Sequence, residues 1–199
     1  MKKLLFIFIV LSYGVSIIAQ EKFTLADELR GSITPQRAWW DLQHYSIEVE
    51  VFAKTKSLSG TNTITYRVLK PNSTMQIDLQ KPMQIDLVTQ NGEKIEFQSI
   101  GSAHFISLKQ VQEIGAENKL TIHFSGAHRE ALNAPWDGGL VWSKDSNGID
   151  FIASANQGIG ASVWWPVKDH PQDEPDKGVD LFITTPKDLV GVGNGRLIQ

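Results

Sequence analysis

Acidic side chains crowd into one short stretch near the end of the sequence. Four carboxylates stand within eight positions, at Asp169, Asp173, Glu174 and Asp176. Together with His170, such a group could coordinate a hard cation. It could equally cap turns, because Asp beside proline accepts backbone N–H groups of its own loop. The neighbouring prolines favour turn capping, and no metal site is predicted here.

The carboxylates end a longer segment, Gln157 to Pro175, in which rare residues and turn formers gather. It contains Gly158, Gly160, a tryptophan pair at 164 and 165, and three prolines. Proline fixes φ and removes a backbone donor, which excludes a helix or a central strand. The segment is therefore predicted to be an ordered loop, and loops of this length usually carry function. The two tryptophans are expected to pack against the domain or to line a cleft.

Other catalytic patterns are not found in the sequence. None of the five histidines begins an H-E-x-x-H helix, the spacing that places two zinc ligands on one helical face. Ser162 does not stand in the G-x-S-x-G pattern of a nucleophilic serine. Gly158 and Gly160 lack the third glycine and the following helix of a dinucleotide-binding loop. We therefore predict no catalytic residue and no metal ligand in this chain.

The elements that must position the loop are predicted to be β-strands. Residues 45–51 alternate between apolar and polar side chains and residues 58–68 are rich in β-branched residues, which indicates a hairpin across 54–57. Asn91-Gly92 indicates a second hairpin, between 85–90 and 93–98, through a type I′ turn. Further strands are predicted at 75–79, 83–87, 105–108, 119–124, 140–142 and 149–152. This pattern predicts an all-β fold, either an antiparallel sandwich or a saddle-shaped multi-sheet domain.

Composition limits the classes of function. The chain has 199 residues, of which 41% are hydrophobic and 21% charged, which is ordinary for one folded domain. A formal net charge of −3 provides no basic surface, so nucleic acid is not an expected partner. Cysteine is absent from the sequence, which excludes disulfides and thiolate metal sites.

The first residues are typical of an export signal. Lys2 and Lys3 precede an apolar run, and Ala19 supplies a small residue at its end, so residues 1–19 are predicted to be a cleaved signal peptide. The run is too short to span a bilayer, and no membrane association is expected after cleavage. Residues 20–40 are predicted to be a lead-in with a short helix at 25–29, and residues 41–199 one β domain. The protein is expected in the periplasm or outside the cell.

A longer pattern begins within the loop and continues beyond it. Residues 162–169 read Ser-Val-Trp-Trp-Pro-Val-Lys-Asp, residues 173–175 Asp-Glu-Pro, residues 179–189 Val-Asp-Leu-Phe-Ile-Thr-Thr-Pro-Lys-Asp-Leu, and residues 193–195 Gly-Asn-Gly. This arrangement resembles the N-terminal domain of the aminopeptidase N family of zinc metallopeptidases. In that family a Pro-x-x-Asp turn precedes a strand ending in Thr/Val-Pro and then a short strand closed by Asn-Gly. The resemblance extends back to about Asp41.

The resemblance implies a role for Gln157, nine residues before Pro166, and for Gly158 beside it. In this family a Glu or Gln at the corresponding place reaches into the catalytic cleft and binds the free α-ammonium of the substrate. An ammonium has three donors and no acceptor, so side-chain oxygens are what it requires. The alternative is that Gln157 only satisfies backbone groups of its loop. Two nearby positions depart from the family pattern, which often has a polar residue in place of Ala155 and an arginine in place of Ser162.

The family carries a G-x-M-E-N loop and an H-E-x-x-H helix after this domain, and this sequence has neither. The resemblance therefore implies a substrate-gating N-terminal domain of an exported zinc aminopeptidase, truncated before the catalytic domain and inactive alone. Zinc would belong to the missing part. The expected partners are a peptide N-terminus and a catalytic metallopeptidase domain. The alternative is a stand-alone exported β-sandwich module that binds peptide or carbohydrate on a platform formed by some of the six tryptophans.

Overall fold

The computed structural model describes residues 22–134 and 136–198, so the predicted signal peptide lies outside the described residues. Its elements are α2 (Leu25–Gly31), α3 (Pro35–Ala38), β1 (Trp40–Phe52), β2 (Ser57–Val68), β3 (Thr74–Asp78), β4 (Gln84–Gln90), β5 (Glu93–Ile95), β6 (Phe97–Ile100), β7 (Ala103–Ser107), β8 (Glu117–Ala127), β9 (Gly139–Lys144), β10 (Asp150–Ala155), the 3₁₀ turn η1 (Ala161–Val163) and β11 (Val179–Thr184). The all-β prediction is confirmed. Among the described residues, no helix has the length and apolar character of a membrane span.

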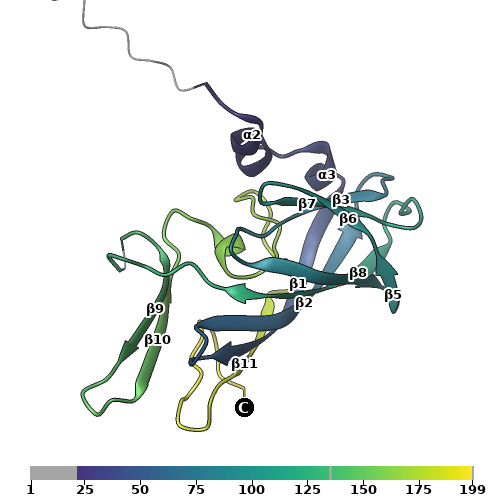
Figure 1. Cartoon of the computed structure of the whole chain (residues 1–199). Coiled ribbons are helices and arrows are strands. Elements are labelled where there is room, and N and C mark those ends of the chain that lie inside the picture. Colours follow the sequence, from purple (N-terminus) through teal and green to yellow (C-terminus); the bar gives the residue numbers. More distant parts are fainter. Residues whose placement is uncertain (1–21, 135, 199) are drawn as a thin grey trace, which may run out of the picture.

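The strands form three groups (Figure 1). One sheet has six strands in the order β11-β1-β2-β8-β4-β5, a second has the order β3-β7-β6, and β9 pairs only with β10. The pairs are antiparallel except for β1 and β11, which run parallel with Tyr45 opposite Val179. This long-range parallel pair departs from the purely antiparallel arrangement that the short, turn-linked strands predict.

The predicted hairpins form where turn chemistry is strong. β1 and β2 pair from Trp40 opposite Val68 to Phe52 opposite Ser57, as the alternation in 45–51 predicts. Asn91 and Gly92 both have positive φ, 53° and 78°, which is the geometry of a type I′ turn. The predicted single strand 93–98 is wrong, because the chain changes sheets at Glu96. β5 completes the large sheet, while the Glu96 carbonyl accepts a hydrogen bond from Ser107 N–H of the small sheet at 3.0 Å.

The six-stranded and the three-stranded sheets contribute to one hydrophobic core. β2, β3 and β7 each place a fully buried isoleucine in it, at Ile64, Ile77 and Ile106. At one end, Tyr66 lies between Trp39 and Trp40, with ring centroids 5.8 and 5.9 Å away in edge-to-face geometry. Segments 75–79 and 83–87 both read Met-Gln-Ile-Asp-Leu. Since β3 and β4 belong to different sheets around this core, the two segments have different environments.

The lead-in segment is tied to this core rather than loose. Thr24 caps α2 by accepting a hydrogen bond from Asp27 N–H, and the Asp27 carboxylate accepts one from Thr24 N–H, which is a complete capping box. The predicted helix at 25–29 is thus confirmed. The sequence did not predict α3, which begins at Pro35 and turns Arg37 into the interior, where it is fully buried.

The segment after β11 does not form the short strand that the resemblance implies, and residues 185–198 have no regular element. It nevertheless packs on β11. A Cβ built on Gly191 would lie 3.1 Å from the Ile183 side chain, and one built on Gly193 would lie 2.9 Å from Leu181. Glycine therefore lets this segment approach the face of β11 more closely than a larger residue could.

His104 should make stability depend on pH near neutrality. It is buried between β6 and the end of β3, where Nδ1 lies 2.8 Å from Ser99 Oγ and Nε2 lies 3.2 Å from the Leu79 carbonyl. Burial lowers the pKa of His104 below its usual value. The unfolded chain therefore takes up the proton first, so the stabilisation is complete above about pH 6.5 and is lost as pH falls through the folded-state pKa.

The measurement is the free energy of unfolding in urea between pH 7.5 and 5, for the wild type and for His104→Gln. Glutamine offers a donor and an acceptor without titrating. Because other groups titrate in both proteins, the difference between the two curves isolates His104. We expect the wild type to lose more stability on acidification, and parallel curves would contradict the assignment.

Candidate functional site

Gln157 and Gly158 lie in a turn that directly follows β10. The turn is closed by Ile159 N–H, which donates to the Asn156 carbonyl at 3.3 Å. Gln157 is exposed, and its side chain forms no hydrogen bond with any described residue. Gly158 has a left-handed φ of 73°, and no atom lies within 4 Å of the position where a Cβ would stand. The amide of Gln157 is therefore available to a ligand, with open space beside it.

The turn is fastened through a single carbonyl oxygen. Ile159 O accepts a hydrogen bond from Arg30 Nη2 of α2 at 2.8 Å and another from Gln80 Nε2 at 2.7 Å. Gln80 N–H also donates to the Ser162 carbonyl at 2.7 Å. Residues from two distant parts of the chain thus fix the position of the turn two residues after Gln157.

Next to the turn, the chain passes closely over Asp169. Gly160 has a φ of 78°, and a Cβ there would stand 2.4 Å from the Asp169 carboxylate. Ser162 Oγ donates to that same carboxylate and accepts from Gln80 Nε2 at 2.9 Å. The backbone conformation and the close approach both require glycine at position 160.

A buried ion pair lies beneath this part of the loop. Arg37 donates to Asp78 Oδ2 from Nη2 at 2.6 Å and from Nε at 3.2 Å, and both side chains are almost completely buried. Asp78 Oδ2 also accepts from Asp169 N–H at 3.1 Å, and Oδ1 accepts from Gln76 Nε2 at 2.9 Å. Burial raises the pKa of Asp78, while the charge and hydrogen bonds of Arg37 act in the opposite direction. The backbone joins here too, since Asp78 and Val167 exchange hydrogen bonds of 2.8 and 3.0 Å.

Lys168 fastens the second half of the loop to β1. Its Nζ forms an ion pair with Asp173, donates to the Trp40 carbonyl at 2.6 Å and stands 4.1 Å from the Trp40 ring centroid. Burial lowers the pKa of Lys168, and the hydrogen bond and charge of Asp173 oppose that shift. Asp173 in turn accepts from Leu42 N–H at 3.3 Å. The loop is therefore held by charged groups that water does not screen well.

The carboxylates of the loop do not act as the turn caps that proline chemistry predicts. Asp169 accepts from Ser162, Asp173 from Lys168 and Leu42, and Asp176 from Gln43 Nε2 at 3.1 Å. Two of these four partners, Leu42 and Gln43, are remote in sequence, because the loop is packed against the sheet and its polar groups must be satisfied there.

The tryptophans also pack, as expected for 164 and 165. Trp165 is buried with its ring edge-on to Tyr45 at 4.7 Å, and Trp164 is half-buried beside it. Trp39 and Trp40 lie in the core, Trp142 is partly buried against it, and Trp136 is the exposed one. Within the described residues, therefore, no platform of several exposed tryptophans exists, which removes the main support for a carbohydrate-binding module.

Zinc would need several convergent ligands in this chain. Among residues 22–134 and 136–198, no group of three or more His, Cys, Asp and Glu side chains could hold a metal ion. Asp169 and Asp173 are engaged by Ser162 and Lys168, which leaves His170 without convergent ligands. The described residues do not fit the zinc of a metallopeptidase.

The sequence did not reveal several residues that build the site, among them Arg37, Gln80 and Lys168. Gln76 and Asp78 alternate with apolar residues in β3, a pattern that predicts exposure to solvent. The structure buries both, because α3 and the loop cover the second face of this strand. The length of the loop was the one sequence feature that could have indicated these buried polar residues, since an ordered loop needs polar partners within the protein.

Comparison with known proteins shows where this fold occurs. No protein-family model matches the sequence, and no curated protein shows a significant match to it. Solved structures do match. The M1 zinc metallopeptidase from Deinococcus radiodurans is 21% identical with a TM-score of 0.60, over 75% of this chain and 33% of that chain. A mutant of it bound to a Tyr-Ser-Ala substrate has the same identity and TM-score, over 79% and 36%.

Native leukotriene A4 hydrolase from Saccharomyces cerevisiae is 18% identical with a TM-score of 0.60, over 83% of this chain and 28% of that chain. The chain thus spans about a third of the length of these structures and has a fold that M1 zinc metallopeptidases contain. This confirms, at the level of fold, the resemblance found in the sequence.

Proposed function

We propose that this chain is the N-terminal, substrate-gating domain of an exported zinc aminopeptidase, and that Gln157 binds the α-ammonium of a peptide. The observation that carries the proposal is the unpaired amide of Gln157 on a turn held by hydrogen bonds from Arg30 and Gln80. A ligand group gains most from a partner whose position is fixed before binding, because less conformational freedom is lost. Gly158 leaves room for the substrate backbone beside that amide.

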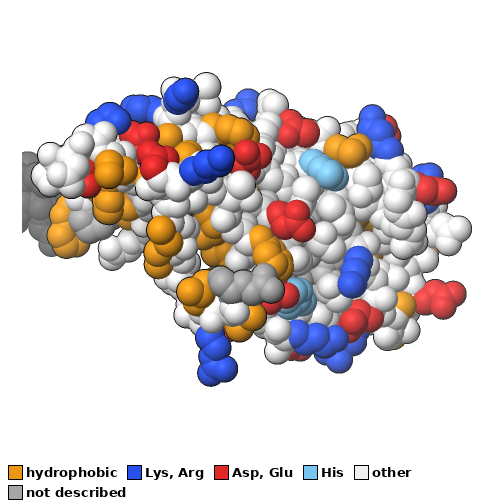
Figure 2. Space-filling view, turned by 90° about the horizontal axis from the view of Figure 1, so that it is seen from below, with side chains coloured by type: hydrophobic (Ala, Val, Ile, Leu, Met, Phe, Trp, Pro, Cys, Tyr) orange, Lys and Arg blue, Asp and Glu red, His pale blue; other side chains and the backbone are white. Residues whose placement is uncertain are grey.

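An exposed apolar surface supports a second domain as partner. Phe151 of β10 and Phe182 of β11 are each 56% exposed, and Val190 and Val192 after β11 are more exposed still. Hydrophobic side chains gather on the side of the molecule that the β9–β10 hairpin occupies (Figure 2). An isolated two-stranded hairpin is only marginally stable in water. We assign this surface to contact with a catalytic metallopeptidase domain.

The test joins residues 20–199 to a metallopeptidase domain that carries the zinc ligands. Hydrolysis should require a free α-ammonium on the peptide and should fall when the joined chain is removed. Turnover that is the same with and without this chain would contradict gating. The isolated 199-residue chain should show no peptidase activity.

Export is the remaining part of the proposal. The basic residues at 2 and 3 and the apolar run after them support cleavage near Ala19. Mass spectrometry of the protein from the periplasm or medium should therefore find a mature N-terminus near Gln20. Recovery of the exported protein with Met1 in place would contradict it.

A further inference from the structure

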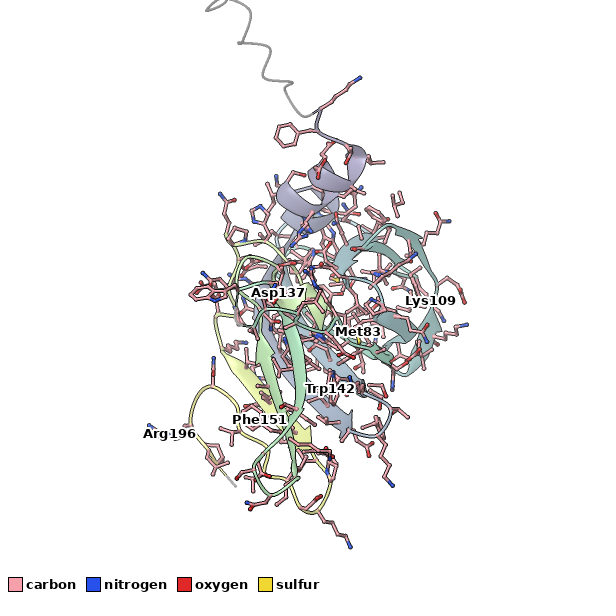
Figure 3. The ribbon with its side chains drawn as sticks, turned by 60° about the vertical axis from the view of Figure 1, so that its left-hand side comes forward. Met83, Lys109, Asp137, Trp142, Phe151 and Arg196 are labelled. Carbon is pink, nitrogen blue, oxygen red and sulfur yellow. The ribbon has the colours of Figure 1, made fainter. Side chains whose placement is uncertain are left out.

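One cleft of the described residues is lined by no residue of the loop that carries Gln157. It has a volume of about 420 Å³, which is the size of a small-molecule site. Its walls are the β4–β5 hairpin on one side and the segment 109–118 on the other. Lys109, on its rim, lies at the right of Figure 3 and Phe151 of β10 at the lower left, and β5 and the β9–β10 hairpin lie on opposite sides of Figure 1. The cleft is therefore separate from the proposed ammonium site.

Hydrogen bonds at the base of the cleft fix the direction of its amides. Gln112 Nε2 donates to the Gln110 carbonyl at 2.9 Å, so Gln112 Oε1 must be an acceptor. It accepts from Asn118 Nδ2 at 2.8 Å and from the Tyr66 hydroxyl at 3.2 Å. Because the Tyr66 proton is used in this way, its oxygen accepts from Gln90 Nε2 at 2.8 Å. Burial raises the pKa of Tyr66 to about 12, so the hydroxyl keeps that proton at neutral pH.

This relay leaves carbonyl oxygens free on two residues of the cleft. Within the described residues, Gln90 Oε1 and Asn118 Oδ1 have no hydrogen-bond partner, and neither atom is buried. Both side chains are half-buried and are held through their nitrogen atoms. The cleft thus presents fixed acceptors to whatever enters it.

Charge defines the ligand further. Glu93 and Lys109 form an ion pair at the rim, which leaves the carboxylate of Glu113 without a countercharge among the described residues. Val111, which also lines the cleft, is 62% exposed and offers apolar contact. Fixed acceptors, one excess negative charge and an apolar wall match a cation with several N–H donors on an aliphatic stem.

We propose that this cleft binds the basic side chain of a peptide, an arginine guanidinium or a lysine ammonium. The probe is N-acetyl-L-argininamide, which has no α-ammonium and therefore cannot report on the site proposed at Gln157. Its matched control is N-acetyl-L-citrullinamide, which has nearly the same shape and no charge. A failure of one proposed site is in this way distinguishable from a failure of the other.

The experiment is a two-dimensional NMR titration of residues 20–199, in which the side-chain amide signals of Gln90, Gln112 and Asn118 report directly. We expect them to shift with the arginine probe, to shift much less with the citrulline probe, and to respond less as salt is added. Equal shifts with both probes, or shifts confined to other parts of the chain, would overturn the proposal.

Two variants should change affinity in opposite directions. Glu113→Gln removes the unpaired charge and should weaken binding of the arginine probe about two- to fivefold, the scale of a surface ion pair. Lys109→Gln releases Glu93 from its ion pair and should strengthen binding by a similar factor. Glu174→Gln, an exposed change in the other loop, is the control that should leave affinity unaltered. Unchanged affinity in both Glu113→Gln and Lys109→Gln would refute the site.

Discussion

Arg37→Met should lower the free energy of unfolding by about 3–5 kcal/mol, the loss typical of a buried charge deprived of its partner. The substitution removes the hydrogen bonds of 2.6 and 3.2 Å to Asp78 and another of 2.6 Å to the Ser32 carbonyl. Methionine fills much of the same space, so the effect reports the charge more than a cavity. Asp78 would then be buried next to Asp169 without a cation, and its pKa should rise further. The measurement is chemical denaturation in urea at pH 7.

A surface ion pair of nearly the same length provides the control. Arg67 donates to Asp41 at 2.7 Å, but half of the Arg67 side chain is exposed. Arg67→Met should therefore cost no more than about 1 kcal/mol. Adding Asp78→Asn to Arg37→Met should restore part of the loss, because the amide needs no countercharge. Similar losses for Arg37→Met and Arg67→Met would show that burial does not decide the strength of this pair.

Gln157→Ala should reduce recognition of a peptide N-terminus by about 1.5–3 kcal/mol, the scale of a hydrogen bond to a charged group. In the protein that joins this chain to a metallopeptidase domain, kcat/KM for a peptide with a free α-ammonium should fall about 10- to 150-fold. Gln157→Glu should retain or increase activity, because a second oxygen and a negative charge then face the ammonium.

Gln172 supplies a matched control for this change, since it is an exposed glutamine later in the same loop. Gln172→Ala should leave kcat/KM unaltered. Thermal stability should be the same for both alanine variants, because neither side chain hydrogen-bonds to a described residue. A Gln157→Ala protein with wild-type kcat/KM would be evidence for the purely local role of this residue.

Sequence patterns predicted those strands and turns whose conformation is set by neighbouring residues. The alternation in residues 45–51 and the Asn91-Gly92 turn gave the β1–β2 and β4–β5 hairpins, because strand faces and turn dihedrals are set by neighbouring residues. The passage of the chain to another sheet at Glu96 was not predictable in this way. It depends on which strand Phe97 meets, and that strand, β7, comes later in the sequence.

The position of the candidate site could be predicted from the sequence, but the residues that hold its loop in place could not. The prolines and the family resemblance located the loop and singled out Gln157, whose binding role stays a prediction. The residues that hold the loop, Arg37, Asp78 and Lys168, were hidden because charged residues are normally exposed. Only the tertiary arrangement shows the oppositely charged partner of each.

The parallel pairing of β1 with β11 also determines when the domain can be completed. β1 is the first strand and β11 the last strand of the described residues, so most of the described chain lies between the paired residues Tyr45 and Val179. A contact of such sequence separation requires the closure of a very long loop, which slows folding. During synthesis one edge of β1 therefore has no native neighbour until β11 has emerged, and in that interval it is an open strand edge available to other chains.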